Sequence, residues 1–250
     1  INIRNGDGMV DDIDHLGNRR IRTISDLIES EFRSGLWKMK RSVQERMNLK
    51  QLRADAQGND ELITPRTLVN TQPLMSSLDY FFARGELSQV VDQKNPLAQL
   101  AHERRVSALG PGGLNRKRAG FEVRDVHTSH YGRICAIETP EGANIGLIMQ
   151  LSLYARINEY GFLVTPFKTV ENGLATDKIV ELMAGDEGES YIAPGDADLD
   201  ESGKFKHEYV LVRYRGDYVS IPANDVQYMD VSSQQTVGIA ASLIPFLEHD

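Results

Sequence analysis

Residues 87–148 decide how this chain is interpreted, and they read LSQVVDQKNPLAQLAHERRVSALGPGGLNRKRAGFEVRDVHTSHYGRICAIETPEGANIGLI. After Pro96, apolar residues recur every three or four positions, at Leu97, Leu100, Ala101, Val106 and Leu109. Proline is common as the first residue of a helix, so this spacing predicts a short amphipathic helix. The glycines and proline of residues 110–113 break that helix and predict a loop.

The loop leads directly into a basic triplet, Arg116, Lys117 and Arg118. A glycine-rich turn followed by cations is typical of a loop that lies against a phosphate backbone. The net charge of −8 argues weakly against nucleic acid, but its distribution does not. Residues 102–133 hold seven lysines and arginines against three acids, whereas residues 168–250 hold six against sixteen. This segregation predicts a basic working region beside an acidic, solvated one.

The rest of the chain predicts an α+β protein. Apolar positions at helical spacing predict a long amphipathic helix over residues 24–47, with a core-packing face, and a mostly helical stretch over 67–82, interrupted at 71–73. Alternation predicts strands at 121–126 and 134–137, and a Pro-Glu-Gly turn predicts a helix over 142–156. Short β-like runs at 162–167, 191–193, 209–214 and 219–221 predict a β-rich region, with turns predicted at Asn172-Gly173, Gly195-Asp196 and Gly216-Asp217.

Composition bounds the class of protein. The chain is 40% hydrophobic and 26% charged, which is ordinary for a globular protein. Cys135 is the only cysteine, which excludes a disulfide framework and fits a reducing, cytoplasmic compartment. No apolar run approaches the roughly 18 residues of a membrane span, so we expect no membrane partner. The first and last residues look like cuts through a longer protein.

Catalytic and metal motifs are weak. Residues 110–117 (GPGGLNRK) superficially resemble a phosphate-binding P-loop, but the second glycine is misplaced and no Ser or Thr follows the lysine. Asp125, His127 and His130 lie close in sequence, yet strand alternation separates His130 from the other two, so we expect no zinc site. No Ser-His-Asp constellation stands out. We therefore expect no catalytic residue and no bound metal in this chain.

Several long strings resemble the centre of the bacterial RNA polymerase β subunit. Within residues 87–148 they are LSQ, NPL, ALGPGGL, RAGFEVRDVH, HYGR, IETPEG and NIGL; outside it they are DDIDHLGNRRIR at 11–22, NEYGFL at 158–163 and ASLIPFLEHD at 241–250. The resemblance implies a fork and protrusion region over residues 1–160, a β-rich external domain over 161–240, and the start of a further core segment over 241–250.

The resemblance also implies site residues. The rifamycin pocket beside the nascent RNA would use Leu87, Ser88, Gln89, Asp92, His102, Arg105, Ser107, Leu109, Pro140, Glu141, Asn144 and Ile148, with Arg22 and Arg116 at its margin. Donors of this kind suit RNA phosphates and hydroxyls. Arg118 would contact the downstream DNA fork. Asp14 and Arg19 would bind a base of the non-template strand, although the same residues also fit a polar loop with exposed ion pairs.

The expected partners follow from the same resemblance: the β′, α and ω subunits, a σ factor, both DNA strands, nascent RNA and rifamycins. The catalytic Mg²⁺ would sit on β′. The sequence departs from the family pattern at Glu86, Val90 and Lys94, and the loss of a bulky aromatic residue at 90 bears on rifamycin affinity. The alternative is a stand-alone nucleic-acid-binding module without catalysis, which would bind DNA by itself in a salt-sensitive way.

Overall fold

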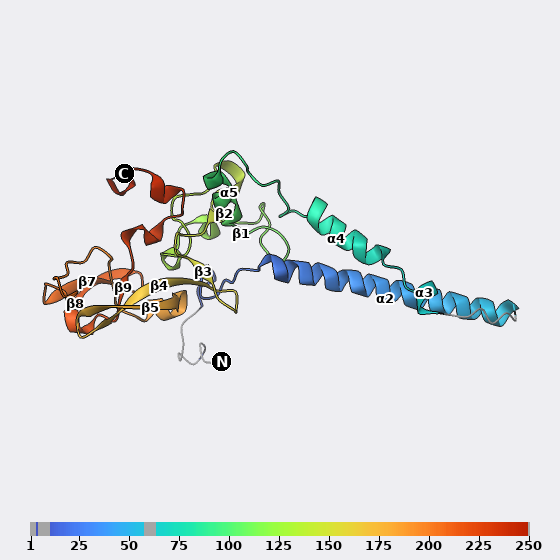
Figure 1. Cartoon of the computed structure of the whole chain (residues 1–250), viewed down its shortest axis with the longest axis horizontal. Coiled ribbons are helices and arrows are strands. Elements are labelled where there is room, and N and C mark those ends of the chain that lie inside the picture. Colours follow the sequence, from blue (N-terminus) through green and yellow to red (C-terminus); the bar gives the residue numbers. More distant parts are fainter. Residues whose placement is uncertain (1–3, 5–10, 58–63, 250) are drawn as a thin grey trace. The chain divides into compact units, whose positions relative to one another are not determined.

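The chain divides into two compact units (Figure 1). The helical unit comprises residues 22–90, and the main unit comprises residues 1–21 and 91–250. The computed structural model describes residue 4, residues 11–57 and residues 64–249. Helices, one small sheet and one large sheet occur together, which confirms the predicted α+β class.

The helical unit contains α2 (Ile24–Gln57), α3 (Pro65–Leu68) and α4 (Gln72–Arg84). The predicted helix at 24–47 is confirmed and continues to residue 57. The helical stretch predicted over 67–82 is interrupted, but the break lies at residues 69–71 rather than 71–73, because Gln72 and Pro73 begin α4. The two long helices pack closely at Gly35, where a Cβ atom would lie 2.8 Å from Leu74 Cδ1. Beside it, Lys38 Nζ donates to Ser77 Oγ at 3.1 Å.

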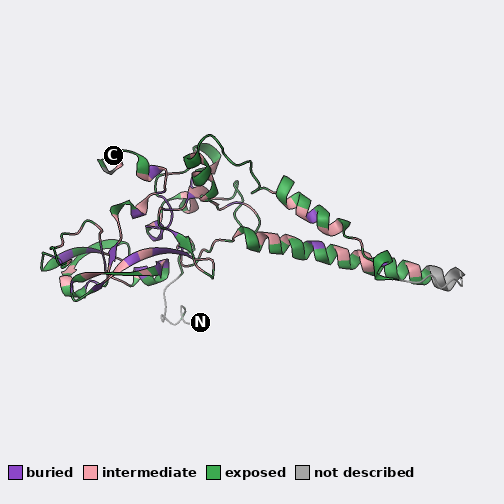
Figure 2. Ribbon diagram, viewed as in Figure 1, coloured by how far each residue is buried: buried purple, intermediate pink, exposed green. Residues whose placement is uncertain are grey.

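Much of the apolar pattern on α2 remains exposed within the described chain (Figure 2). Trp37, which the helical spacing placed on the core-packing face, is 65% exposed and lies under the ammonium group of Lys40. The prediction that α2 packs against a core therefore holds for the residues facing α4, such as buried Gly35, and not for Trp37.

In the main unit, α5 (Pro96–Glu103) is followed by a small antiparallel sheet of β1 (Arg105–Ser107) and β2 (Ile148–Gln150). The helix predicted after Pro96 is confirmed, although it ends before Val106 and Leu109. Between the two strands the chain forms single turns of 3₁₀ helix at Glu122–Arg124, Thr128–His130 and Gly142–Asn144.

Three local predictions in this region were wrong. Residues 121–126 form a 3₁₀ turn instead of a strand, because no neighbouring strand pairs with them in the described chain. Ile134 makes only an isolated bridge with Leu151. The helix predicted over 142–156 is absent, because Gly142 (φ +86°) and Gly146 (φ +68°) adopt left-handed conformations that a right-handed helix excludes.

The large sheet supplies most of the remaining fold. Its strands are β3 (Arg156–Ile157), β4 (Leu163–Glu171), β5 (Leu174–Met183), β6 (Ile192–Ala193), β7 (Tyr209–Tyr214), β8 (Asp217–Pro222) and β9 (Tyr228–Asp230). The order is β3-β4-β9-β6-β7-β8, and β5 pairs with β4. A short helix, α6 (Ala184–Gly188), follows β5. The four predicted β-like runs are confirmed, whereas β3, β5 and β9 were missed.

Two tight turns explain the hairpins of this sheet. Asn172 and Gly173 join β4 to β5, and Arg215 and Gly216 join β7 to β8; all four residues have positive φ. Two consecutive positive φ angles are the signature of a type I′ turn, whose twist matches that of paired strands. The turn predicted at Gly216-Asp217 therefore lies one residue earlier.

Among the described residues of the main unit, buried apolar side chains form three clusters. The largest holds Val170, Ala193, Phe205, Val210, Val212, Val226 and Met229; the second holds Leu16, Ile134, Leu163 and Ala184; the third holds Phe167, Leu182 and Ile192. The second cluster joins three distant segments. Leu16 comes from the N-terminal residues, Leu163 comes from β4, and Ile134 comes from residues 108–147 between β1 and β2, which we call the irregular region. Residues 11–21 are thereby fixed against the sheet.

The segment after β9 packs against β4 of the large sheet. Gln235 is fully buried, and its side-chain amide donates to Thr165 Oγ1 at 2.9 Å and to the carbonyl of Pro166 at 3.0 Å. Single 3₁₀ turns follow at Ala241–Leu243 and Leu247–His249. Residue 250 lies outside the described residues, and the assignment of 241–250 to a further core segment stays a prediction.

Candidate nucleic-acid interface

Hydrogen bonds at both ends of α5 position the first group of predicted site residues. The side chain of Asn95 caps the helix by accepting a 2.7 Å hydrogen bond from the amide of Ala98. At the other end, His102 Nδ1 accepts a 3.0 Å hydrogen bond from the backbone amide of Asp92. The Asp92 carboxylate accepts from the amide of Lys94 at 3.1 Å. The structure thus brings together two predicted pocket residues, Asp92 and His102.

The β1–β2 pair gathers further predicted residues. Ser107 lies opposite Ile148 in the antiparallel register, and Arg105 lies opposite Gln150. Arg105 and Ser107 are exposed on the same side of β1, because strand side chains alternate. The Ser107 hydroxyl accepts from the amide of Leu109 at 3.2 Å, and Leu109 is buried beneath the glycine-rich loop.

A closed loop, which we call the pocket turn (residues 139–148), carries Pro140, Glu141 and Asn144. The Thr139 hydroxyl closes it by donating to the Ile148 carbonyl and accepting from the Gly146 amide, both at 2.9 Å. Glu141 is exposed. Asn144 Oδ1 is a buried acceptor without a hydrogen-bond partner among the described residues.

The basic loop (residues 110–119) presents its cations to solvent. Gly110 (φ 100°) and Gly112 (φ 75°) reverse the chain, and the amide of Gly113 donates to the Gly110 carbonyl at 2.9 Å. Asn115 then starts a turn whose carbonyl accepts from the Arg118 amide at 2.9 Å. The side chains of the basic triplet 116–118 are exposed. Exposed cations of this kind can pair with phosphates and release the counterions bound there, so the attraction weakens as salt rises.

Arg124 joins the basic loop to the pocket turn, and sequence reasoning missed it. Its guanidinium donates to the carbonyls of Ala143 and Ile145, both at 2.9 Å, and to that of Arg116 at 3.3 Å. A further bond runs from Nε to the Ala119 carbonyl at 3.4 Å. Every residue has a backbone carbonyl, so the sequence does not show which carbonyls accept hydrogen bonds from Arg124. The pattern indicated only that Arg124 is a polar position in a predicted strand.

Four predicted residues belong to the helical unit: Arg22, Leu87, Ser88 and Gln89. There the Ser88 amide donates to the Gly85 carbonyl at 3.0 Å, and the Ser88 hydroxyl donates to the Phe82 carbonyl. Val90, the departure from the family pattern, is 95% exposed. The grouping of these residues with those of the main unit stays a prediction.

Asp14 and Arg19 lie in a loop that is tied to the 3₁₀ turn at Thr128–His130. The Leu16 amide donates to Ser129 Oγ at 3.0 Å, and His127 Nε2 lies 2.8 Å from Asp12 Oδ2. The pKa of the Asp12 carboxyl is lowered, first by a hydrogen bond from the Asp14 amide and then by His127. Asp14 and Arg19 are both half-buried within this loop.

Asp12, His127 and Ser129 together resemble a catalytic triad, which the sequence did not reveal. His127 Nδ1 lies 2.7 Å from Ser129 Oγ and also accepts from the Ser129 amide at 3.1 Å. That amide bond makes Nδ1 the acceptor and places the ring proton on Nε2, facing Asp12. Ser129 is buried, and its oxygen already accepts from Leu16, so it is not presented to a substrate. The triad is a structural anchor.

The rings of two histidines, His127 and His130, lie near one another in the main unit. The rings of His127 and His130 are 6.2 Å apart, and burial lowers the pKa of His130 to about 4, with Arg19 and His127 adding to the effect. In the part of the chain that the structure describes, no group of three or more His, Cys, Asp and Glu side chains is placed to hold a metal ion.

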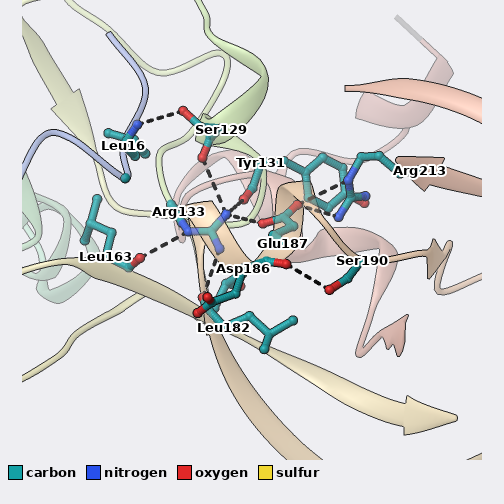
Figure 3. Close-up of polar contacts among 12 residues, drawn as sticks. Leu16, Ser129, Tyr131, Arg133, Leu163, Leu182, Asp186, Glu187, Ser190 and Arg213 are labelled. Carbon is teal, nitrogen blue, oxygen red and sulfur yellow. Dashed lines mark hydrogen bonds and ion pairs between the residues drawn. The ribbon is translucent and has the colours of Figure 1, made fainter. Parts of the chain in front are cut away.

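A buried network of charges lies where the irregular region meets the large sheet (Figure 3). Arg133 is fully buried and donates to the carbonyls of Leu163 at 3.1 Å and Leu182 at 2.9 Å. It also forms an ion pair with Glu187, whose second oxygen accepts from Arg213 at 2.9 Å. Arg133 stands in the HYGR string, whereas nothing in the sequence marked Glu187 as its partner.

Two family comparisons match most of the main unit. Residues 89–157 match the family described as RNA polymerase Rpb2, domain 3, and residues 167–232 match the RNA polymerase beta subunit external 1 domain. The chain is 57% identical over 241 residues to the DNA-directed RNA polymerase subunit beta of Rhodopirellula baltica. That alignment covers 96% of this chain and 19% of the relative, so the chain spans about a fifth of the relative's length.

Proposed function

Because the chain belongs to the RNA polymerase β-subunit family, we propose that it acts within an assembled polymerase in DNA-directed RNA synthesis. Its role is positioning: the main unit forms part of the channel for the RNA–DNA hybrid and of the downstream DNA fork. The observation that carries this role is the exposed basic triplet of residues 116–118, presented by a glycine-rich loop whose base is fixed by Arg124. Exposed cations on a fixed loop suit a phosphate backbone.

The pocket assignments form part of the same proposal. Asp92, His102, Arg105 and Ser107 lie on α5, its N-terminal approach and β1, next to a pocket turn that contains the unsatisfied acceptor of Asn144. With Leu109, Pro140, Glu141 and Ile148, and with Leu87, Ser88 and Gln89 from the helical unit, they would face nascent RNA and would accept a rifamycin. Arg22 and Arg116 would lie at the margin of this pocket.

The N-terminal loop extends the interface to the non-template strand. Asp14 and Arg19 would supply an acceptor and a donor to a base edge, a pairing that suits guanine. The bond between Leu16 and Ser129 supports this assignment, because it fixes the loop against the main unit. The proposed division of the chain at residue 160 is supported by family matches that end at 157 and begin at 167.

The remaining partners are proposed from the family. They are β′, which would hold the catalytic Mg²⁺, the α and ω subunits, and a σ factor. The donor set supports placing the metal elsewhere, because the described residues around the pocket turn and the basic loop are mainly cationic and amide groups. The compartment would be the cytoplasm, at the nucleoid. Within residues 4, 11–57 and 64–249, no helix combines the length and apolar character of a membrane crossing.

Arg118→Ala in the full-length β subunit, assembled into polymerase, tests the proposed function. Loss of one phosphate contact should lower the salt dependence of downstream-duplex binding by about one counterion and change pausing. Arg215→Ala is the matched control, since Arg215 is also exposed but lies at the β7–β8 turn. Elongation and salt slope identical to wild type in Arg118→Ala would refute the role of the loop.

A second experiment tests the pocket and the alternative function. Rifampicin titrated against polymerase assembled with the wild-type β subunit should block extension at short transcripts. Ser107→Ala and Asn144→Ala should weaken this inhibition, and unchanged inhibition in both variants would contradict the pocket. The stand-alone module instead predicts salt-sensitive DNA binding by residues 1–250 alone, with the affinity of the assembled enzyme.

A further inference from the structure

Arg124 holds backbone atoms of two separate segments at once. Its guanidinium contacts the carbonyls of Ala143 and Ile145 in the pocket turn and those of Arg116 and Ala119 in the basic loop. A guanidinium is a rigid plane of five N–H donors, so four bonds to four carbonyls fix the acceptors relative to one another. These bonds leave little of the side chain to contact DNA or RNA.

A second contact joins the same two segments through the backbone. Gly146 in the pocket turn has φ +68°, and a Cβ atom at that position would lie 2.2 Å from the Arg124 carbonyl oxygen. The main chain at residue 124 therefore packs directly against the main chain at residue 146. The Thr139 hydroxyl binds the Gly146 amide from the other side, so a displacement there would reach the whole pocket turn.

We propose that Arg124 is a positioning residue that couples the basic loop to the pocket turn, so that the downstream DNA fork and the RNA-proximal pocket respond to one another. This inference rests on the proposed function for its two ligands, but the coupling itself is a property of the main unit. A contact that displaces the cations of residues 116–118 pulls on the carbonyls of Arg116 and Ala119. The guanidinium transmits that displacement to Ala143 and Ile145.

The structural test uses the full-length β subunit in assembled polymerase, with Arg124→Ala, Arg124→Lys and the control Arg215→Ala. Trypsin cleavage after residues 116–118 reports on the basic loop, and amide hydrogen exchange of residues 143–148 reports on the pocket turn. Arg124→Ala should raise both rates by about tenfold, the effect of losing roughly one charged hydrogen bond. Arg215→Ala should change neither rate, and a rise in only one of them in Arg124→Ala would overturn the coupling.

Arg124→Lys tests whether the coupling depends on the several donors of the guanidinium or only on its positive charge. A single ammonium group cannot reach four carbonyls in two segments, so Arg124→Lys should resemble Arg124→Ala in both rates. Rates restored to those of wild type by Arg124→Lys would show that a positive charge suffices, which would overturn a positioning role.

The functional test is a double-mutant cycle with Arg118 in transcription elongation. If Arg124 acts through the basic loop, Arg124→Ala should slow or destabilise elongation in the same direction as Arg118→Ala, and the double variant should lie within about twofold of the stronger single variant. Fully multiplicative effects would contradict the coupling. A silent Arg118→Ala would instead refute the proposed function, while the trypsin and exchange rates would still decide the coupling.

Discussion

The hydroxyl of Tyr131 donates a 2.6 Å hydrogen bond to Oδ2 of Asp230, which lies 99 residues further along the chain. The guanidinium of Arg213 covers the Tyr131 ring at 3.5 Å and also approaches Asp230 Oδ2 at 3.5 Å. Burial raises the pKa of both the Tyr131 phenol and the Asp230 carboxyl, although Arg213 opposes the shift at each. The irregular region and the large sheet are therefore joined by groups that have little access to water.

Tyr131→Phe should destabilise the chain by about 1–3 kcal/mol, because it removes the donor to a buried carboxylate and leaves Asp230 short of hydrogen bonds. Asp230 Oδ1 already lacks a partner among the described residues. Urea denaturation followed by circular dichroism measures the change. Tyr160→Phe is the control, since Tyr160 is 72% exposed and should shift the midpoint little. Equal midpoints for the two variants would contradict the prediction.

Glu187→Gln should cost about 3–5 kcal/mol, the usual effect of removing one partner from a buried ion pair. Arg133 would keep its charge in a fully buried position without a carboxylate partner, and Arg213 would lose the charged oxygen, Glu187 Oε1, that accepts from two of its nitrogens. Amide exchange of residues 182–187 and the urea midpoint both report the loss. Glu189→Gln makes the same chemical change at an exposed position two residues away, and it should be nearly neutral. If Glu187→Gln were as stable as Glu189→Gln, the Glu187 carboxylate would not be stabilising the buried charges of Arg133 and Arg213.

His130 should make the main unit less stable as the pH falls from about 6.5 to 4. Burial lowers its pKa from 6.5 to about 4, so the unfolded chain takes up the proton over this range while the folded chain does not. Proton uptake by the unfolded state lowers the free energy of unfolding, by roughly 2–3 kcal/mol for a shift of this size.

The His130 prediction is checked by measuring the urea midpoint between pH 7.5 and 4 in the wild type and in His130→Asn. The asparagine amide oxygen can accept from the His127 amide as Nδ1 does, but it does not titrate. The variant should lose most of the slope between pH 6.5 and 4. Parallel curves for the two proteins would assign the acid sensitivity to other groups.

Gly161→Ala should weaken the attachment of the N-terminal loop. Gly161 has φ +87°, its carbonyl accepts from the Ile21 amide at 2.7 Å, and a Cβ atom there would lie 2.7 Å from the Ile21 carbonyl oxygen. Strain at such a position costs about 1–3 kcal/mol. Faster exchange of the Leu16 and Ile21 amides would show it. Gly120→Ala is the control, because no atom lies within 4 Å of its Cβ position.

Much of the fold could be predicted from short sequence patterns, because turns and helix ends depend mainly on residues that are close together in the chain. Asn172-Gly173 forms a hairpin turn, and the second helical stretch is interrupted as predicted, although the break lies at residues 69–71 rather than 71–73. The helix over 142–156 failed because apolar spacing does not report backbone handedness, and Gly142 and Gly146 need positive φ. The irregular region is held together by hydrogen bonds from side chains to backbone carbonyls, and such bonds impose no periodic pattern on the sequence. The apolar spacing there was therefore interpreted, wrongly, as strands and a helix.

The candidate site divides in the same way. Residue types predicted the basic loop, since three consecutive cations after glycines are visible in sequence. The resemblance supplied the pocket residues, whose roles stay predictions, while the register of β1 and β2 explains why Ser107 and Ile148 meet. Arg124 and the pair of Arg133 with Glu187 could not be predicted, because their partners are backbone carbonyls or residues tens of positions away.

The bond between the Leu16 amide and Ser129 Oγ sets an order on the synthesis of this chain. The two residues are 113 positions apart, and at about 5–20 residues per second a ribosome needs roughly 5–25 s to make the second after the first. Throughout that interval the segment carrying Asp14 and Arg19 has emerged without the groups that fix it. The complete helical unit is made before this anchor exists, so the N-terminal loop cannot be fixed by Ser129 until residues 22–129 have been synthesised.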